Sequence, residues 1–130
     1  MIKLEAIVLA VGKMNGVFDD PESKAFRLRN PLLLKTYRPE KKVDSENYRV
    51  FSSVMGGFKA GVADVQAKSS GKNHRLSEDN TLRDLLVLYG FSNEQTVKKV
   101  VLFLRRALQD ENVSANTPLK WFLETSVEEK

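Results

Sequence analysis

Residues 92–108 carry the pattern that most narrows the fold, because apolar side chains recur there at intervals of three and four residues. This spacing gathers them on one face of an α-helix: Val97, Val100, Val101, Leu104 and Leu108. Four cations fall on the outer face: Lys98, Lys99, Arg105 and Arg106. Ser92, followed by Gln95, forms a capping-box pattern that would begin this helix. Such a helix is stable mainly through packing of its apolar face, so we expect a helical core.

Residues 54–65 form a second segment with helical spacing. Ser52 or Ser53 is placed to cap its N-terminus, and Gly71 is placed to stop it. Three glycines lie inside the segment: Gly56, Gly57 and Gly61. Each costs about 1 kcal/mol against alanine in a helix interior. We therefore expect a neighbouring backbone to pack closely against this helix.

Two shorter helices are predicted from their end signals. Residues 82–89 form an apolar stretch at helical spacing that ends near Gly90. Thr117 before Pro118 is typical of an N-cap followed by proline at the first helical position. The helix that they open would carry Leu119, Phe122 and Leu123, and it would also contain Trp121, for which core packing is favoured over a ligand platform.

The first segment supports two interpretations. Apolar residues from Leu4 to Met14 recur at helical spacing, which predicts an amphipathic helix ending near Gly16. The same run is rich in β-branched residues and leads to Asn15–Gly16, which is typical of a strand entering a tight turn. Periodicity alone does not choose between them. Residues 17–50 are broken by prolines and predict a loop with short elements.

Together these segments predict a mostly α fold in one domain, residues 1–130, with an irregular or short β segment between about residues 30 and 51. A chain of 130 residues buries enough surface to fold without a disulfide or a metal. It has no Cys and one His, His74, so we expect no zinc site, no cofactor and no thiol nucleophile. His74 lies beside Lys72 and Arg75 and is interpreted as a surface residue.

The longest apolar run, residues 6–11, is far shorter than the roughly 20 residues that span a membrane. No secretory signal is recognised either, because Glu5 directly precedes that run. These features predict a location in the cytoplasm and no membrane partner. The net charge of +4 suits a polyanion, but the cations are scattered among acidic residues. Nucleic acid is therefore a weakly supported partner, and the oligomeric state is not predicted.

Short motifs, each weak alone, follow one another in a fixed order: residues 13–18, 23–31, 51–60, 81–96 and 117–119. In order and interval they resemble the small lysozyme-like proteins of phages and prophages, peptidoglycan-cleaving domains of the lytic-transglycosylase type. That family has Glu-Gly-Phe after its first helix, then Arg-Asn-Asn-Asn-Pro-Gly-Asn, then a helix with a Gly-x-x-Ala motif. The resemblance covers nearly the whole chain. It implies a lysozyme-like helical domain and favours a helix for the first segment.

The resemblance also implies that the catalytic acid is missing. Asn15 occupies the position of the family's glutamic acid, and an amide cannot donate the proton that glycosidic cleavage requires. Four further residues stand where polar residues or glycine are expected: Leu28, Arg29, Leu32 and Leu33. Glu22 and Glu94 are the candidates for a relocated acid, and Asp19, Asp20, Asp44 and Glu46 are further carboxylates close to the expected cleft. The alternative for each of them is a solvated or helix-capping carboxylate.

The resemblance therefore implies a lysozyme-like phage or prophage protein that has lost glycosidase activity. It would bind peptidoglycan or another glycan through Arg27, Asn30 and Tyr89, or dock another virion protein on its apolar 32–34 edge. Two alternatives stay open. One is an active muramidase or lytic transglycosylase with a relocated carboxylate. The other is a small basic helical protein that binds nucleic acid through the outer face of residues 98–106.

Overall fold

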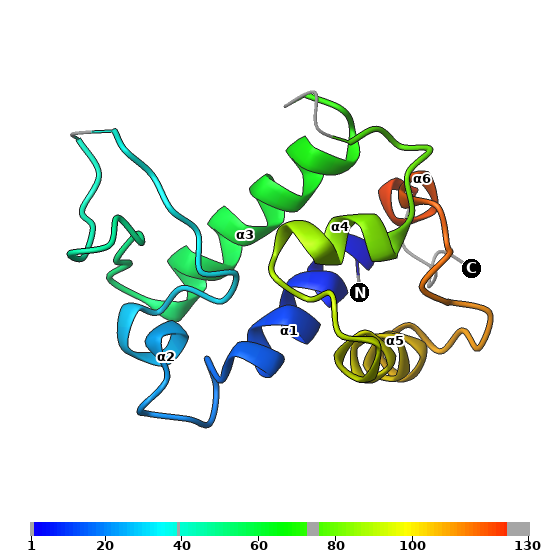
Figure 1. Cartoon of the computed structure of the whole chain (residues 1–130), viewed down its shortest axis with the longest axis horizontal. Helices are drawn as coiled ribbons and strands as arrows, with labels where there is room; N and C mark the ends of the chain where they lie inside the picture. Colours follow the sequence, from blue (N-terminus) through cyan, green and yellow to red (C-terminus); the bar gives the residue numbers. More distant parts are fainter. Residues whose placement is uncertain (1, 39, 73–75, 125–130) are drawn as a thin grey trace.

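The computed structural model describes residues 2–38, 40–72 and 76–124, and its regular structure is helical (Figure 1). The helices in chain order are α1 Lys3–Asn15, α2 Lys24–Leu28, α3 Val54–Ser69, α4 Leu82–Leu88, α5 Glu94–Leu108 and α6 Leu119–Leu123. Extended structure among the described residues is limited to isolated bridges. The predicted mostly α class is confirmed. No helix in these ranges is long and apolar enough to cross a membrane.

The first segment is a helix, α1, and not a strand. Gly16 ends it at φ +87°, and the backbone N–H of Val17 donates to the carbonyl of Gly12, which is the hydrogen bond of a Schellman stop. Asn15–Gly16 thus terminates a helix and does not form a hairpin turn. The helix packs on α3, α5 and α6, and for this reason it is apolar on almost every side.

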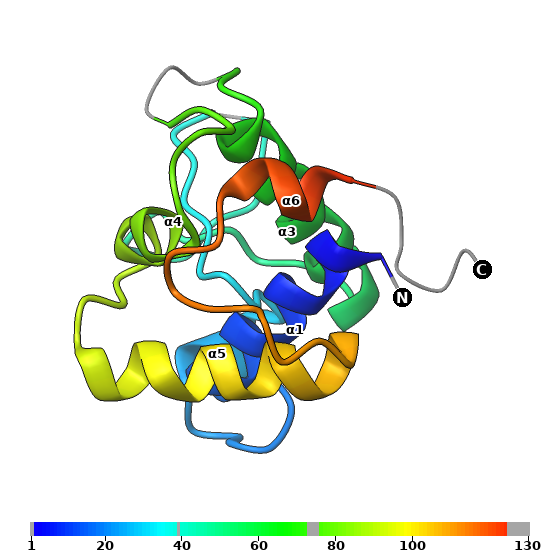
Figure 2. The ribbon, with the colours of Figure 1, turned by 90° about the vertical axis from the view of Figure 1, so that its right-hand side faces the viewer.

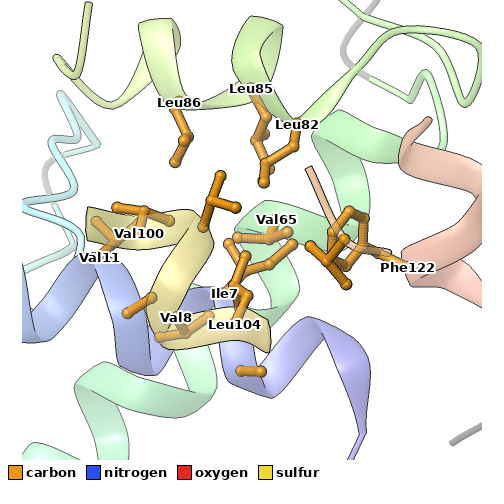
Figure 3. Close-up of a cluster of buried hydrophobic side chains, with 14 of the residues drawn as sticks. Ile7, Val8, Val11, Val65, Leu82, Leu85, Leu86, Val100, Leu104 and Phe122 are labelled. Carbon is orange, nitrogen blue, oxygen red and sulfur yellow. The ribbon is translucent and has the colours of Figure 1, made fainter. Parts of the chain in front are cut away.

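The core surrounds α1. Figure 2 shows α5 crossing beside α1, with α6 and α3 on the other side. Side chains of α1, α3, α4, α5 and α6 meet in one buried cluster (Figure 3). The labelled members are Ile7, Val8, Val11, Val65, Leu82, Leu85, Leu86, Val100, Leu104 and Phe122, all of them buried. The apolar stripe predicted for residues 97–108 is therefore the face of α5 that enters this core.

Lys3, the first residue of α1, lies off the apolar stripe in the sequence, yet its side chain is buried against α6. Its Nζ donates to the carbonyl of Trp121 at 3.2 Å and lies 3.9 Å from the centre of the Trp121 ring. Glu124 is 3.7 Å from the same nitrogen. Trp121 also meets the Phe122 ring edge-on and packs against the core, as predicted.

Two predicted helix starts are wrong by one residue. The N-cap of α5 is Asn93, not Ser92, because the side-chain oxygen Oδ1 of Asn93 accepts hydrogen bonds from the backbone N–H groups of both Gln95 and Thr96. Pro118, not Thr117, occupies the N-cap position of α6. The Thr117 hydroxyl instead accepts from the backbone N–H of Ser114 in the preceding turn.

Ser53 does cap α3, accepting a hydrogen bond from the backbone of Gly56. The close packing expected at the α3 glycines is also present. A Cβ atom built on Gly61 would lie 3.0 Å from Val8 and 3.2 Å from Leu32. On the opposite side, a Cβ atom on Gly12 of α1 would lie 3.0 Å from Pro31. The chain around Pro31 is thus packed between α1 and α3.

Residues 30–38 and 40–50 form an irregular lobe, which lies at the left in Figure 1, far from α6. Two isolated antiparallel bridges join Lys35 to Tyr48 and Val43 to Arg49, as expected for a short β segment. Asn30 organises the lobe from a fully buried position. Its amide donates to the carbonyls of Leu34 and Arg49, and its oxygen accepts from the backbone of Leu34.

Candidate functional site

A groove of about 640 Å³ lies between the lobe, α3 and the end of α4. We call it the α3–α4 groove. The lobe contributes Leu32, Leu33, Leu34, Lys35 and Tyr48 to its walls. Helix α3 contributes Asp64 and Lys68, and the end of α4 with the two residues that follow it contributes Leu88, Tyr89 and Gly90. The lining combines an apolar edge with a few polar groups, which is the usual composition of a site for a small or extended ligand.

The polar part of the groove is a connected group of three side chains. The Tyr89 hydroxyl donates to Asp64 Oδ2 at 2.6 Å, and Lys68 forms an ion pair with the same carboxylate. Lys68 Nζ also lies 5.1 Å from the centre of the Tyr89 ring. Burial, with the nearby Asp64 carboxylate, raises the pKa of the Tyr89 hydroxyl well above its ordinary value. Tyr89 is therefore a fixed proton-bearing donor, and Asp64 is an acceptor.

The lobe side of the groove is apolar and cationic. Leu32 is buried, whereas Leu33 and Leu34 are partly exposed along the edge. The Tyr48 ring is flanked by two lysines, with the Nζ of Lys24 at 4.6 Å and that of Lys35 at 4.7 Å from its centre. This edge offers flat and branched carbon surfaces next to hydrogen-bond donors.

The predicted site residues do not all lie at the α3–α4 groove. Asn15 and the 30–31 dipeptide do meet, because Asn15 Nδ2 donates to the carbonyl of Pro31 at 2.9 Å. Tyr89 faces the groove, as its predicted binding role requires. Asn15 itself does not line the groove, and the Asn30 amide is used inside the lobe. Arg27 is exposed on α2.

The two candidate replacement acids lie outside the groove lining. Glu22 is exposed in the turn after α1, where its backbone N–H donates to Asp20. Glu94 begins α5, pairs with Arg83 and lines a separate hollow of about 350 Å³. Of the carboxylates in the described ranges, Asp64 is the one that lines the groove. His74 lies outside the described residues.

The outer face of α5 gathers the cations that the sequence placed there. Lys98, Lys99 and Arg106 are exposed around Leu102, whose surface is 49% exposed. Arg105 is partly buried, and its Nε donates to the carbonyl of Val113. The four cations therefore share one surface, although Arg105 also forms a hydrogen bond within the fold.

Sequence reasoning missed most of the groove. Asp64 and Lys68 are four residues apart, and this spacing indicates only an ion pair on a helix surface. Nothing in the spacing indicates that Tyr89, 25 residues later, meets them. No sequence pattern indicates that Tyr48 and Lys35 line the groove, because the lobe has no periodicity that fixes which side chains face α3.

The described residues contain no cluster of three His, Asp or Glu side chains suited to a metal ion. No known protein family, no curated protein and no solved structure matches this chain.

Proposed function

We propose that this protein is a lysozyme-like domain that binds a glycan strand without cleaving it. The observation that carries the proposal is the α3–α4 groove, where the Asp64–Tyr89–Lys68 group faces an apolar edge. Sugars present hydroxyl and amide groups around their rim and C–H groups on their faces. A carboxylate acceptor and a lysine donor beside leucine and tyrosine surfaces match both features.

The backbone conformation at two positions, the C-cap of α2 and one residue of the lobe, supports the lysozyme-like assignment. Arg29 has φ +54° and Leu33 has φ +55°, a left-handed conformation that asparagine and glycine adopt far more readily. In the resembling family, both positions carry asparagine within the Arg-Asn-Asn-Asn-Pro-Gly-Asn stretch. Arg29 and Leu33 thus adopt a conformation that the asparagines of the family's motif would favour.

The chemistry around Asn15 supports the loss of cleavage. Its amide is held by the Pro31 carbonyl and offers no acidic proton. The carboxylate of the groove, Asp64, accepts hydrogen bonds from Tyr89 and Lys68 and so does not present a proton to a leaving oxygen. An active glycosidase with a relocated acid would need Glu22 or Glu94 to reach the groove.

The test pairs binding with lysis on purified peptidoglycan. We expect the wild-type protein to cosediment with peptidoglycan and leave the turbidity of the suspension unchanged. Asp64→Asn should weaken binding by at least about fivefold, since it removes the acceptor charge of the groove. Glu94→Gln is the matched control, because it also neutralises one ion-paired carboxylate but lies outside the groove.

Three results would decide between the alternatives. Clearing of the suspension that is abolished by Glu94→Gln or Glu22→Gln would establish the relocated-acid glycosidase. Equal binding by Asp64→Asn and Glu94→Gln would remove the groove as the glycan site. Absence of binding would overturn the glycan function and favour a virion structural role, with the 32–34 edge as the surface against a protein partner.

A second candidate function rests on the outer face of α5, where Lys98, Lys99, Arg105 and Arg106 surround Leu102. A nucleic acid bound there would release counterions, so its affinity would fall steeply with salt concentration. Lys98→Gln with Lys99→Gln should then abolish binding of a random double-stranded oligonucleotide at about 50 mM salt. Unchanged binding by this double variant would exclude the α5 face.

A further inference from the structure

A second hollow, of about 340 Å³, lies between the lobe and the middle of α3. We call it the lobe hollow. Three alanines of α3 form its floor: Ala60, Ala63 and Ala67. Four cations line it: Lys35, Arg38, Lys41 and Arg49. Its one carboxylate, Asp64, is already paired with Lys68 and hydrogen-bonded by Tyr89. The hollow is therefore strongly positive.

The cations of the hollow have few anionic neighbours. Within residues 2–38, 40–72 and 76–124, only Arg38 has a carboxylate within 4.0 Å, that of Glu40 at 3.9 Å, and both side chains are largely exposed. Lys35 lies over the Tyr48 ring, and Arg49 lies 4.5 Å from the centre of the Phe51 ring. These aromatic contacts orient the two cations without neutralising them.

The lobe hollow adjoins the α3–α4 groove. The two share the lining residues Leu34, Lys35 and Asp64. A ligand in the groove that passes over these residues enters the hollow. The part of the ligand that lies there meets four cations and a single carboxylate, that of Asp64, which is already paired with Lys68.

We propose that the lobe hollow binds the phosphate group of a phosphorylated glycan whose sugars occupy the α3–α4 groove, an inference that rests on the glycan-binding function proposed above. A phosphate monoester carries a charge near −2 at neutral pH and three strong acceptor oxygens. Four cations suit this dianion better than the single charge of a carboxylate or a sulfate ester. The guanidinium groups of Arg38 and Arg49 match phosphate oxygens in pairs.

The test compares two β-1,4-linked N-acetylglucosamine tetramers by calorimetric titration at one ionic strength. One tetramer is neutral, and the other carries a single 6-phosphate. We expect the phosphorylated tetramer to bind the wild-type protein at least tenfold more tightly. In the Arg38→Gln, Lys41→Gln double variant this preference should fall below threefold, while affinity for the neutral tetramer stays unchanged.

The matched control is the Lys98→Gln, Lys99→Gln double variant, which removes the same charge from the distant α5 face. It should keep the tenfold preference, because the phosphate does not contact that face. A loss of preference equal to that of the hollow variant would show general charge attraction and overturn the site. Both pairs of substituted side chains lie on the surface, and a thermal melt of each variant verifies that it is folded.

The remaining outcomes separate this inference from the function on which it rests. Failure of the neutral tetramer to bind would overturn the proposed glycan function. Equal affinity of the wild-type protein for the two tetramers would overturn the phosphate site alone. A 6-sulfated tetramer that binds as tightly as the phosphorylated one would contradict selection of a dianion. Displacement of the phosphorylated tetramer by a single-stranded oligonucleotide, lost in the hollow variant, would assign the hollow to nucleic acid instead.

Discussion

A Cβ atom on Gly57 would lie 2.0 Å from the carbonyl oxygen of Arg29. It would also lie 2.9 Å from the ring of Pro31. The first turns of α3 thus touch the chain that leads into the lobe, and only a residue without a side chain permits the contact. This contact sets the position of the 32–35 edge against α3, and with it the width of the α3–α4 groove.

Gly57→Ala should therefore destabilise the protein by at least about 3 kcal/mol, because a carbonyl oxygen of the backbone cannot yield to a methyl group as a side chain can. Chemical denaturation measures the change. Gly56→Ala is the matched control one residue earlier in the same helix, where the added Cβ would lie 3.3 Å from the Ser53 hydroxyl. We expect it to change stability by less than about 1 kcal/mol. Equal losses from the two variants would contradict the contact.

Asn30→Ala should destabilise the lobe through unpaired backbone groups. The substitution leaves the carbonyls of Leu34 and Arg49 and the N–H of Leu34 without their buried partner. Loss of several such bonds costs about 3 kcal/mol in total. Hydrogen exchange should show faster exchange at Leu34 and Arg49, with the α5 amides protected as before. Uniform loss of protection would mean that the lobe and the helices unfold as one unit.

The helices were predictable because their determinants are local. The apolar stripe of α5 and the Ser53 cap follow spacings of three and four residues, and such spacings predict helices without knowledge of the fold. Choosing helix over strand for residues 3–15 was different. The segment is buried on nearly all sides, so its pattern loses the alternation of polar and apolar faces that distinguishes the two.

The groove was not predictable in the same way, because it depends on contacts between distant residues. Asp64 and Tyr89 are on different helices, and Lys35 faces them from a lobe without periodicity. Tyr89 was found through the family resemblance alone. The glycines of α3 were the one local signal that a backbone packs there, and they did not identify Arg29 as the partner.

Arg29→Asn should stabilise the protein by up to about 1 kcal/mol. Arg29 ends α2 at φ +54°, and asparagine tolerates this left-handed conformation better than arginine. Arg27→Asn is the control, since Arg27 is also exposed but lies inside α2, where asparagine is a poorer helix former. Thermal melts should shift in opposite directions. A lower melting temperature for Arg29→Asn would mean that the arginine side chain makes a contact that outweighs its backbone strain.

Asp84 should contribute to acid sensitivity. Hydrogen bonds from the Thr81 backbone, and then from the Asn80 side chain, hold the pKa of this carboxyl below its ordinary value. A carboxyl with a lower pKa in the folded protein stabilises it fully above its unfolded pKa of about 3.9, and this contribution is lost as pH falls through the folded pKa. The stability difference between wild type and Asp84→Asn should thus shrink between about pH 5 and pH 2.5. Asp84 also donates its backbone N–H to the Thr81 hydroxyl, so the two residues form the capping box that begins α4. A difference independent of pH would contradict the role of the Asp84 carboxylate in this capping box.

Asn15→Glu tests the proposal that position 15 corresponds to the catalytic acid of the resembling family. Replacing the amide removes the hydrogen bond from Nδ2 to the Pro31 carbonyl and directs a carboxylate toward a backbone oxygen. We expect a loss of about 1–2 kcal/mol in stability, which should diminish as the new carboxyl is protonated at acidic pH. Asn15→Gln keeps the length of glutamate and the amide, and it controls for the added methylene. Neither variant should release muropeptides from peptidoglycan, as detected by mass spectrometry, because position 15 does not line the α3–α4 groove in which we propose that the glycan binds. Release of muropeptides by Asn15→Glu, but not by Asn15→Gln, would overturn this expectation, because it would show that a carboxylate at position 15 reaches a bound glycan. Equal stability of the two variants would contradict the contribution of the hydrogen bond from Asn15 to Pro31.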